Sequence, residues 1–158
     1  MLDVRVGVWE RDEGISAAVG AALAGYGAEV SAGRHPAELA AVPLDLLMIS
    51  PGAVGWAGAG AAGPLARTLQ AGQAVSYGTS PRDTLTFSSL EGDRLCLAVQ
   101  RELVPLSGPV VEQQELVLPF PTGASPLPFL AAAGALLLCG VPPEELPRLA
   151  AGRGHRPG

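Results

Sequence analysis

The first half of the chain alternates between short apolar runs and segments with helical spacing of apolar residues. Four runs predict strands: residues 4–9 and 46–50 are mostly apolar, as in strands buried in a sheet, and residues 29–32 and 73–77 are expected to form a second and a fourth short strand. After the first run, apolar residues recur every three or four positions, as on one face of a helix: Ile15, Ala18, Val19, Ala22, Leu23 and Tyr26. Strands that alternate with helices predict a parallel sheet.

The limits of the helices follow from capping residues. Asp12 is the expected N-cap of the first helix, and Gly27 is the expected residue beyond its C-terminus. Two further short helices are predicted between the later strands, at residues 36–42 and 64–71.

The pattern changes after residue 83 to an alternation of apolar and polar positions. Segments 84–90, 95–103 and 110–118 have the two-residue period of half-buried strands. Turn-forming residues separate them at 91–93 and 107–109. Strands joined by such short turns predict an antiparallel meander.

The C-terminal part is predicted to be helical. Residues 127–139 form an apolar helix that ends at Gly140, and a last short helix opens at Pro142. The fold class we expect is therefore α/β: a small Rossmann-like parallel sheet flanked by helices and extended by an antiparallel β-meander. Residues 1–152 are expected to form a single domain, with a flexible tail at 153–158.

The amino-acid composition of the chain excludes some kinds of catalytic and binding site. The chain has 158 residues, of which 48% are hydrophobic and 16% charged, as expected for a compact fold with a sizeable core. All ten basic residues are Arg, and the sequence contains neither Lys nor Asn. A phosphate-binding P-loop lysine and a Schiff-base lysine are therefore impossible. We expect no cofactor.

The charge and the cysteine content of the chain argue against further classes of function. The net charge is −5 and no basic stripe is present, which argues against nucleic-acid binding. Cys96 and Cys139 lie in apolar runs and are expected to be buried free thiols without a metal. The longest apolar run, 129–141, is too short to span a bilayer, and the N-terminus lacks the pattern of a signal peptide. These features predict a cytoplasmic protein without a membrane partner.

Residues 4–82 resemble a receiver domain of two-component systems. Glu10 and Asp12 lie where receivers carry the acids that hold magnesium, and residues 45–52 resemble the phosphoacceptor strand. Ser50 stands at the position of the acceptor aspartate, and the receiver's essential lysine is missing. The resemblance therefore implies a receiver-like shell without aspartyl phosphorylation.

Residues 73–152 resemble the later part of the central domain of Mur ligases, the ATP-dependent amide ligases of cell-wall synthesis. The matching pieces are a strand ending in Tyr77-Gly78, two strand blocks, an Ala-rich helix and the Gly-Val step at 140–141. The resemblance implies the layout of that domain. The P-loop of the ligases is absent, so no catalytic residue carries over.

A glycine pattern at 58–63 matches G-x-G-x-x-G in letters. A dinucleotide-binding fingerprint leaves a strand directly, whereas the preceding strand ends near Ser50. The next strand ends in Tyr77-Gly78 rather than in the acidic residue that holds a ribose. The pattern therefore does not predict a dinucleotide site.

Ligands of parallel sheets bind beyond the carboxyl ends of the strands. We predict that this edge gathers the ligand-binding residues: Glu10, Asp12, Ser50, Gly78, Ser80, Arg82 and Asp83. Ser80 and Arg82 offer hydroxyl and guanidinium donors that suit a carboxylate or phosphate, so the expected partner is an anionic small molecule or a protein.

Two functions remain open. The first is a non-catalytic binding or interaction module, a degenerate relative of a Mur ligase or receiver domain. The alternative is a small-molecule enzyme or nucleotide-binding domain that uses the same edge. An apolar contact surface near the meander would favour the first, and a deep pocket holding Ser80, Arg82 and an acid would favour the second.

Overall fold

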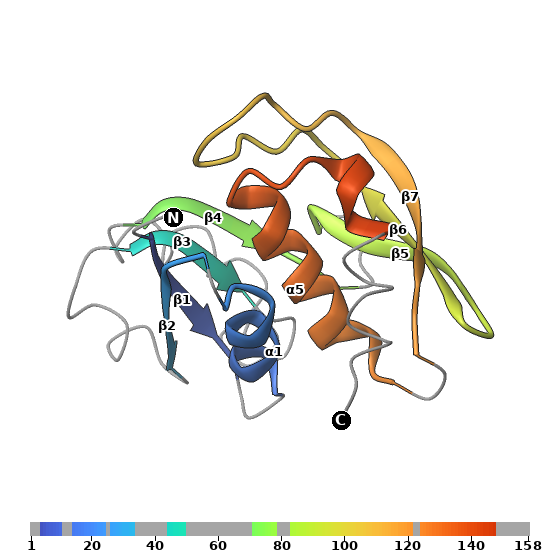
Figure 1. Ribbon diagram of the computed structural model, residues 1–158, viewed down its shortest axis with the longest axis horizontal. Helices are drawn as coiled ribbons and strands as arrows, with labels where there is room; N and C mark the ends of the chain where they lie inside the picture. Colours follow the sequence, from blue (N-terminus) through green and yellow to red (C-terminus); the bar gives the residue numbers. More distant parts are fainter. Residues whose placement is uncertain are drawn as a thin grey trace.

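The computed structural model describes residues 4–10, 14–24, 26–33, 44–49, 71–78, 83–121 and 124–147. Within these ranges the chain is mixed α/β, with one parallel and one antiparallel sheet (Figure 1). The predicted helices at 36–42 and 64–70, the 58–63 pattern and the 153–158 tail lie outside the described residues.

The parallel sheet contains the four strands that the apolar runs predict. They are β1 (Val4–Trp9), β2 (Ala28–Gly33), β3 (Leu44–Ile49) and β4 (Ala71–Ser76), in the order β2-β1-β3-β4. All neighbouring pairs are parallel. Both faces of the inner strand β1 are buried, as the continuous apolar runs indicate. Residue 71, predicted as the end of a helix, is instead the first residue of β4.

Helix α1 (Ile15–Ala22) is shorter than its apolar pattern predicts. Its buried residues are Ile15 and Val19, and the chain leaves the helix at Leu23. The predicted N-cap, Asp12, is wrong: the N-cap residue is Gly14, which has a left-handed backbone and no side chain to cap with. Tyr26 and Gly27 lie beyond the helix, in the turn that leads to β2.

The antiparallel meander is confirmed. It consists of β5 (Leu85–Glu91), β6 (Arg94–Val99) and β7 (Gln114–Pro119) in sequential order. β5 has the predicted length, whereas β6 and β7 are shorter than predicted because the chain leaves the ladder after β6. Residues 100–113 form a long connection that is closed by pairing of Leu103 with Val111.

The two sheets are joined where β4 ends. Tyr77 pairs with Leu85 in the parallel sense, and the backbone N–H of Gly78 donates to the carbonyl oxygen of Leu85 at 3.0 Å. Tyr77 is fully buried at this junction. The carboxyl end of the parallel sheet therefore continues directly into the antiparallel sheet.

Helix α5 (Pro126–Leu138) fills the space between the two sheets. Figure 1 shows it crossing the middle of the molecule, and it contacts α1, β3 and β5. All residues from Leu130 to Leu138 are buried, so the helix is enclosed on every side. Among the described residues, no helix has the length and apolar character needed to cross a membrane.

The C-terminus of α5 is closed by a Schellman motif and by a neighbouring loop. Gly140 has φ of +102° and donates to Leu137, while the N–H of Val141 donates to Leu136. The N–H of Leu106 donates to Leu138 at 2.7 Å, and the Ser107 hydroxyl donates to the Cys139 carbonyl at 3.5 Å. The end of the helix is thereby fixed against the connection between β6 and β7. The short 3-10 helix η1 (Pro143–Glu145) follows.

Gly134 lets α5 approach the junction of the sheets. A Cβ atom at this position would overlap the Cδ1 atom of Leu85 and would lie 3.7 Å from the Cε atom of Met48. Leu85 and Met48 are fully buried in the close-packed core, so an added Cβ would force the end of the Leu85 side chain to shift among its neighbours. This close contact accounts for a glycine here although glycine weakens helices.

We expect Gly134→Ala to be less stable than Gly20→Ala by about 1–3 kcal/mol, the usual cost of overpacking a core. Gly20 lies in α1 with nothing within 4 Å of an added Cβ, so it gains the same helix propensity without the overlap. Urea unfolding of both variants measures the difference. Equal midpoints would contradict the close packing of α5 against Leu85.

Candidate functional site

The predicted edge lies at the carboxyl ends of the parallel strands. Glu10 follows β1 directly, and Gly78 follows β4 after Tyr77. Because β3 lies between these strands and neighbouring strands are about 4.8 Å apart, the two ends are separated by roughly 10 Å. The other predicted edge residues, except for Asp83, lie outside the described residues: Asp12, Ser50, Ser80 and Arg82.

Glu10 closes the N-terminus of α1. Its side chain is buried, with 5% exposed, and its two carboxylate oxygens accept the N–H groups of Ile15 at 3.0 Å and Ser16 at 2.8 Å. Its own N–H donates to the carbonyl oxygen of Gly33 at the end of β2. The first turn of a helix leaves N–H groups without partners and favours negative charge. Glu10 supplies both the acceptors and the charge.

The hydrogen bonds between Glu10 and α1 affect where an anion could bind. In dinucleotide-binding folds, the phosphate lies at the N-terminus of the helix after the first strand. Here the carboxylate of Glu10 occupies the first-turn N–H groups of that helix. A phosphate at the same place would have to displace a buried carboxylate of like charge. The ligand-binding role expected for Glu10 stays a prediction.

The β4–β5 connection is anchored at both described ends. Gly78 is buried and bonded to Leu85, as described above. The carbonyl oxygen of Asp83 accepts the side-chain amide of Gln100 at 2.7 Å, and the N–H of Gln100 donates to Thr84 at 2.8 Å. The antiparallel sheet therefore positions Gly78 and Asp83, which come from one segment of the chain.

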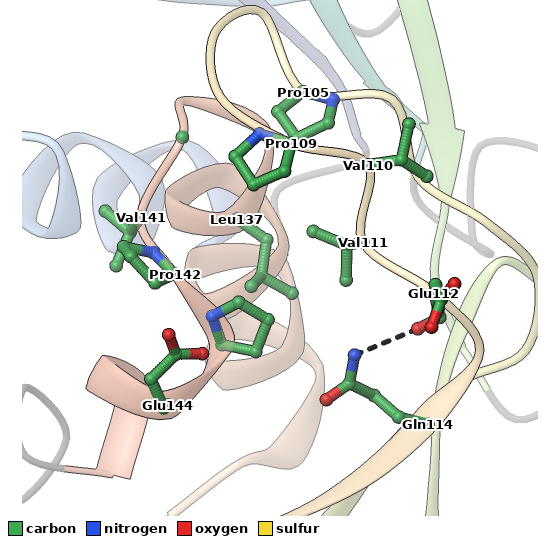
Figure 2. Close-up of a pocket in the computed structure, with 12 residues that line it drawn as sticks. Pro105, Pro109, Val110, Val111, Glu112, Gln114, Leu137, Val141, Pro142 and Glu144 are labelled. Carbon is green, nitrogen blue, oxygen red and sulfur yellow. Dashed lines mark hydrogen bonds between the residues drawn. The ribbon is translucent and has the colours of Figure 1, made fainter.

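A cavity that the sequence analysis does not predict lies at the C-terminal end of α5 (Figure 2). We call it the α5 cavity, and its volume is about 270 Å³. It lies between the connection from β6 to β7 and the segment after α5. Its lining residues are Pro105, Pro109, Val110, Val111, Glu112, Gln114, Leu137, Gly140, Val141, Pro142, Pro143 and Glu144.

The α5 cavity offers few hydrogen-bond donors. Its four prolines have no N–H group. The N–H groups of Val111, Gly140 and Val141 donate to Leu103, Leu137 and Leu136, respectively. The amide of Gln114 donates to the Glu112 carbonyl at 3.0 Å.

The charges around the α5 cavity are negative. Glu112 and Glu144 are exposed carboxylates on different sides of it, as Figure 2 shows. None of the described residues that line it is Arg or His. An anion would find few donors and no positively charged lining residue there, whereas an apolar group or a cation would meet suitable surroundings.

A second cavity of about 230 Å³ lies where the N-terminal half of α5 approaches α1. It is lined by Ala18, Pro121, Ala124, Ser125, Pro128, Phe129 and Ala132. Phe129 packs edge-on against Phe120 with ring centroids 5.1 Å apart. Ser125 alone among these lining residues has a polar side chain, so the cavity offers few groups that could bond to a polar ligand.

Catalytic groups do not gather in the part of the chain that the structure describes. No group of three or more His, Cys, Asp or Glu residues is placed there to hold a metal ion. The Cys96 thiol is partly exposed and lies 3.6 Å from a carboxylate oxygen of Glu115. Cys139 is buried, and this burial raises the pKa of its thiol above the ordinary value of 9.0. The expectation of two buried thiols is therefore correct for Cys139 and wrong for Cys96, which lies on the outer face of β6.

We expect the variant Glu10→Ala to lower the free energy of unfolding by about 1–3 kcal/mol, because two N–H groups of α1 lose their acceptors. The control is Glu29→Ala, which removes an exposed carboxylate from β2 and should change stability by less than about 0.5 kcal/mol. Urea unfolding followed by circular dichroism measures both. A loss of the same size in both variants would contradict the capping role.

The two thiols should react differently with a thiol reagent such as DTNB. In the folded protein we expect Cys96 to react faster than Cys139, because Cys139 is buried and its raised pKa keeps it protonated. Above about pH 9 the unfolded thiol ionises while the folded one does not, so this group lowers stability as pH rises. Rapid labelling of the Cys96→Ser variant would contradict this assignment.

Comparison of the chain with protein-family models and with curated proteins finds no match. Two features of the geometry stand out: a helix N-terminus already occupied by Glu10, and an apolar cavity with acidic residues at its sides.

Proposed function

We propose that the protein is a non-catalytic binding module whose contact surface is the α5 cavity and the apolar residues beside it. The lining of the cavity carries this proposal: eight of its twelve residues are aliphatic or proline, and three of its backbone donors are engaged within the protein. The lining residue Val110 is 47% exposed, and Val104, one residue before the lining residue Pro105, is 53% exposed. Exposed apolar surface of this kind is typical of interaction sites.

The parallel part is proposed to be a Rossmann-like sheet that has no nucleotide site at α1. Its strand order, β2-β1-β3-β4, supports this assignment, because β2 and β3 lie on opposite sides of β1, so the order of the strands reverses there. The contact of Glu10 with α1 argues against a phosphate at this position. The alternative, a nucleotide-binding domain or enzyme acting at the carboxyl edge, has less support for this reason.

We propose further that the second half descends from a Mur-ligase-like domain that has lost its catalytic part. The order of elements supports this origin: β4 is followed by Tyr77-Gly78, a three-stranded meander and the Ala-rich α5. A receiver-like origin for the first half has only the strand pattern in its favour. Free thiols at Cys96 and Cys139 are consistent with a reducing cytoplasm as the location.

The proposal predicts that nucleotides do not bind. A ligand present at about 100 times its Kd stabilises the folded state by roughly 2.7 kcal/mol, which raises Tm measurably. We therefore expect unchanged Tm values in millimolar ATP, ADP or UDP with magnesium, measured by differential scanning calorimetry. A nucleotide-dependent increase in Tm, accompanied by release of phosphate, would overturn the proposal in favour of the enzyme.

A further inference from the structure

We infer that the α5 cavity binds an aliphatic side chain of a protein partner that carries Arg or Lys next to it. This inference rests on the proposed binding function and names the chemistry of the partner. It follows from three properties of the cavity: its size, the rigidity of its walls and its charge.

The size of the cavity favours a side chain over a cofactor. Cavities that bind small molecules usually measure about 300–1,000 Å³, and this one has about 270 Å³. The buried residues Leu137 and Val111 contribute apolar surface, and Val110 lines the cavity while remaining 47% exposed. Val104, which precedes the lining residue Pro105 in the chain, is 53% exposed.

The walls are held in place before any partner arrives. One wall is fixed by the pairing of Leu103 with Val111, whose backbone groups bond to each other in both directions at 2.9 Å. The other wall follows the Schellman turn at Gly140. Prolines line both walls, and their fixed φ leaves little freedom to lose on binding.

The negative charge beside the cavity favours a basic residue next to the aliphatic side chain of the partner. Glu112 and Glu144 flank the cavity as exposed carboxylates, and the whole chain has a net charge of −5. A partner with an acidic residue at this position would be repelled by both carboxylates. A guanidinium or ammonium group would pair with one of them and would steer the approach of the partner.

The test uses the capped peptide acetyl-Gly-Ser-Leu-Arg-Ser-Gly-amide, titrated into ¹⁵N-labelled protein and followed by amide chemical shifts. We expect saturable shifts at Val111, Gly140 and their neighbours. Two matched peptides, one with Leu replaced by Ser and one with Arg replaced by Glu, should each bind at least about fivefold more weakly.

Variants of the protein test the same contacts from the other side. Val110→Ser should weaken binding at least about fivefold, because it removes apolar surface from the cavity. Its control is Val117→Ser, which changes a valine of β7 that is 57% exposed and does not line the cavity. Glu144→Gln should weaken binding roughly twofold to fivefold and reduce its salt dependence. Glu29→Gln makes the same change in net charge far from the cavity and should leave binding unchanged.

Three results would overturn the inference: no saturable shifts with the Leu-Arg peptide, shifts that map away from the cavity, or equal binding of the peptide with Glu in place of Arg. None of these results depends on whether nucleotides bind. A failure of the inference alone leaves the nucleotide experiment negative, whereas a failure of the proposed function appears as nucleotide-dependent stabilisation.

Discussion

The enclosure of α5 is the constraint on which the remaining structure depends. A helix with nine consecutive buried residues, Leu130 to Leu138, has no face that water can solvate, so neighbouring elements must cover it all round. The contacts with α1, β3 and β5 meet this requirement and bring together two sheets with different strand directions. The absence of a side chain at Gly134 permits the close approach of α5 to Leu85 of β5.

The same helix accounts for the position of the cavity. The last carbonyl groups of a helix lack partners within it. Here the Schellman turn at Gly140 and the groups of Leu106 and Ser107 satisfy them. These hydrogen bonds hold two proline-containing segments beside each other at one end of α5. The surface proposed for binding is thus a by-product of completing the end of a buried helix.

The elements of the fold could be predicted from the sequence more fully than the candidate site. Continuous apolar runs predict β1 and β3, and alternation predicts the meander, because a strand covered on both faces and a strand covered on one face have different residue patterns. The N-cap was predicted wrongly because capping rules consider adjacent residues, whereas Glu10 reaches α1 from the end of β1. The α5 cavity could not be predicted, because it forms only when residues 105–114 and 137–144 meet in three dimensions. The number of prolines in these two segments was the one signal present in the sequence.

The late position of α5 in the chain affects how the protein is synthesised. The ribosome completes α1, the described parallel strands and the meander before it adds residues 126–138. Until then, the apolar surfaces that α5 covers have no permanent partner, and such surfaces promote aggregation of nascent chains. The hairpins of the meander need only local contacts and can form early, whereas closure of the core must wait for the helix. A ribosome stalled before residue 126 would therefore hold a chain that can form strands but cannot bury them, which is the kind of chain that chaperones recognise.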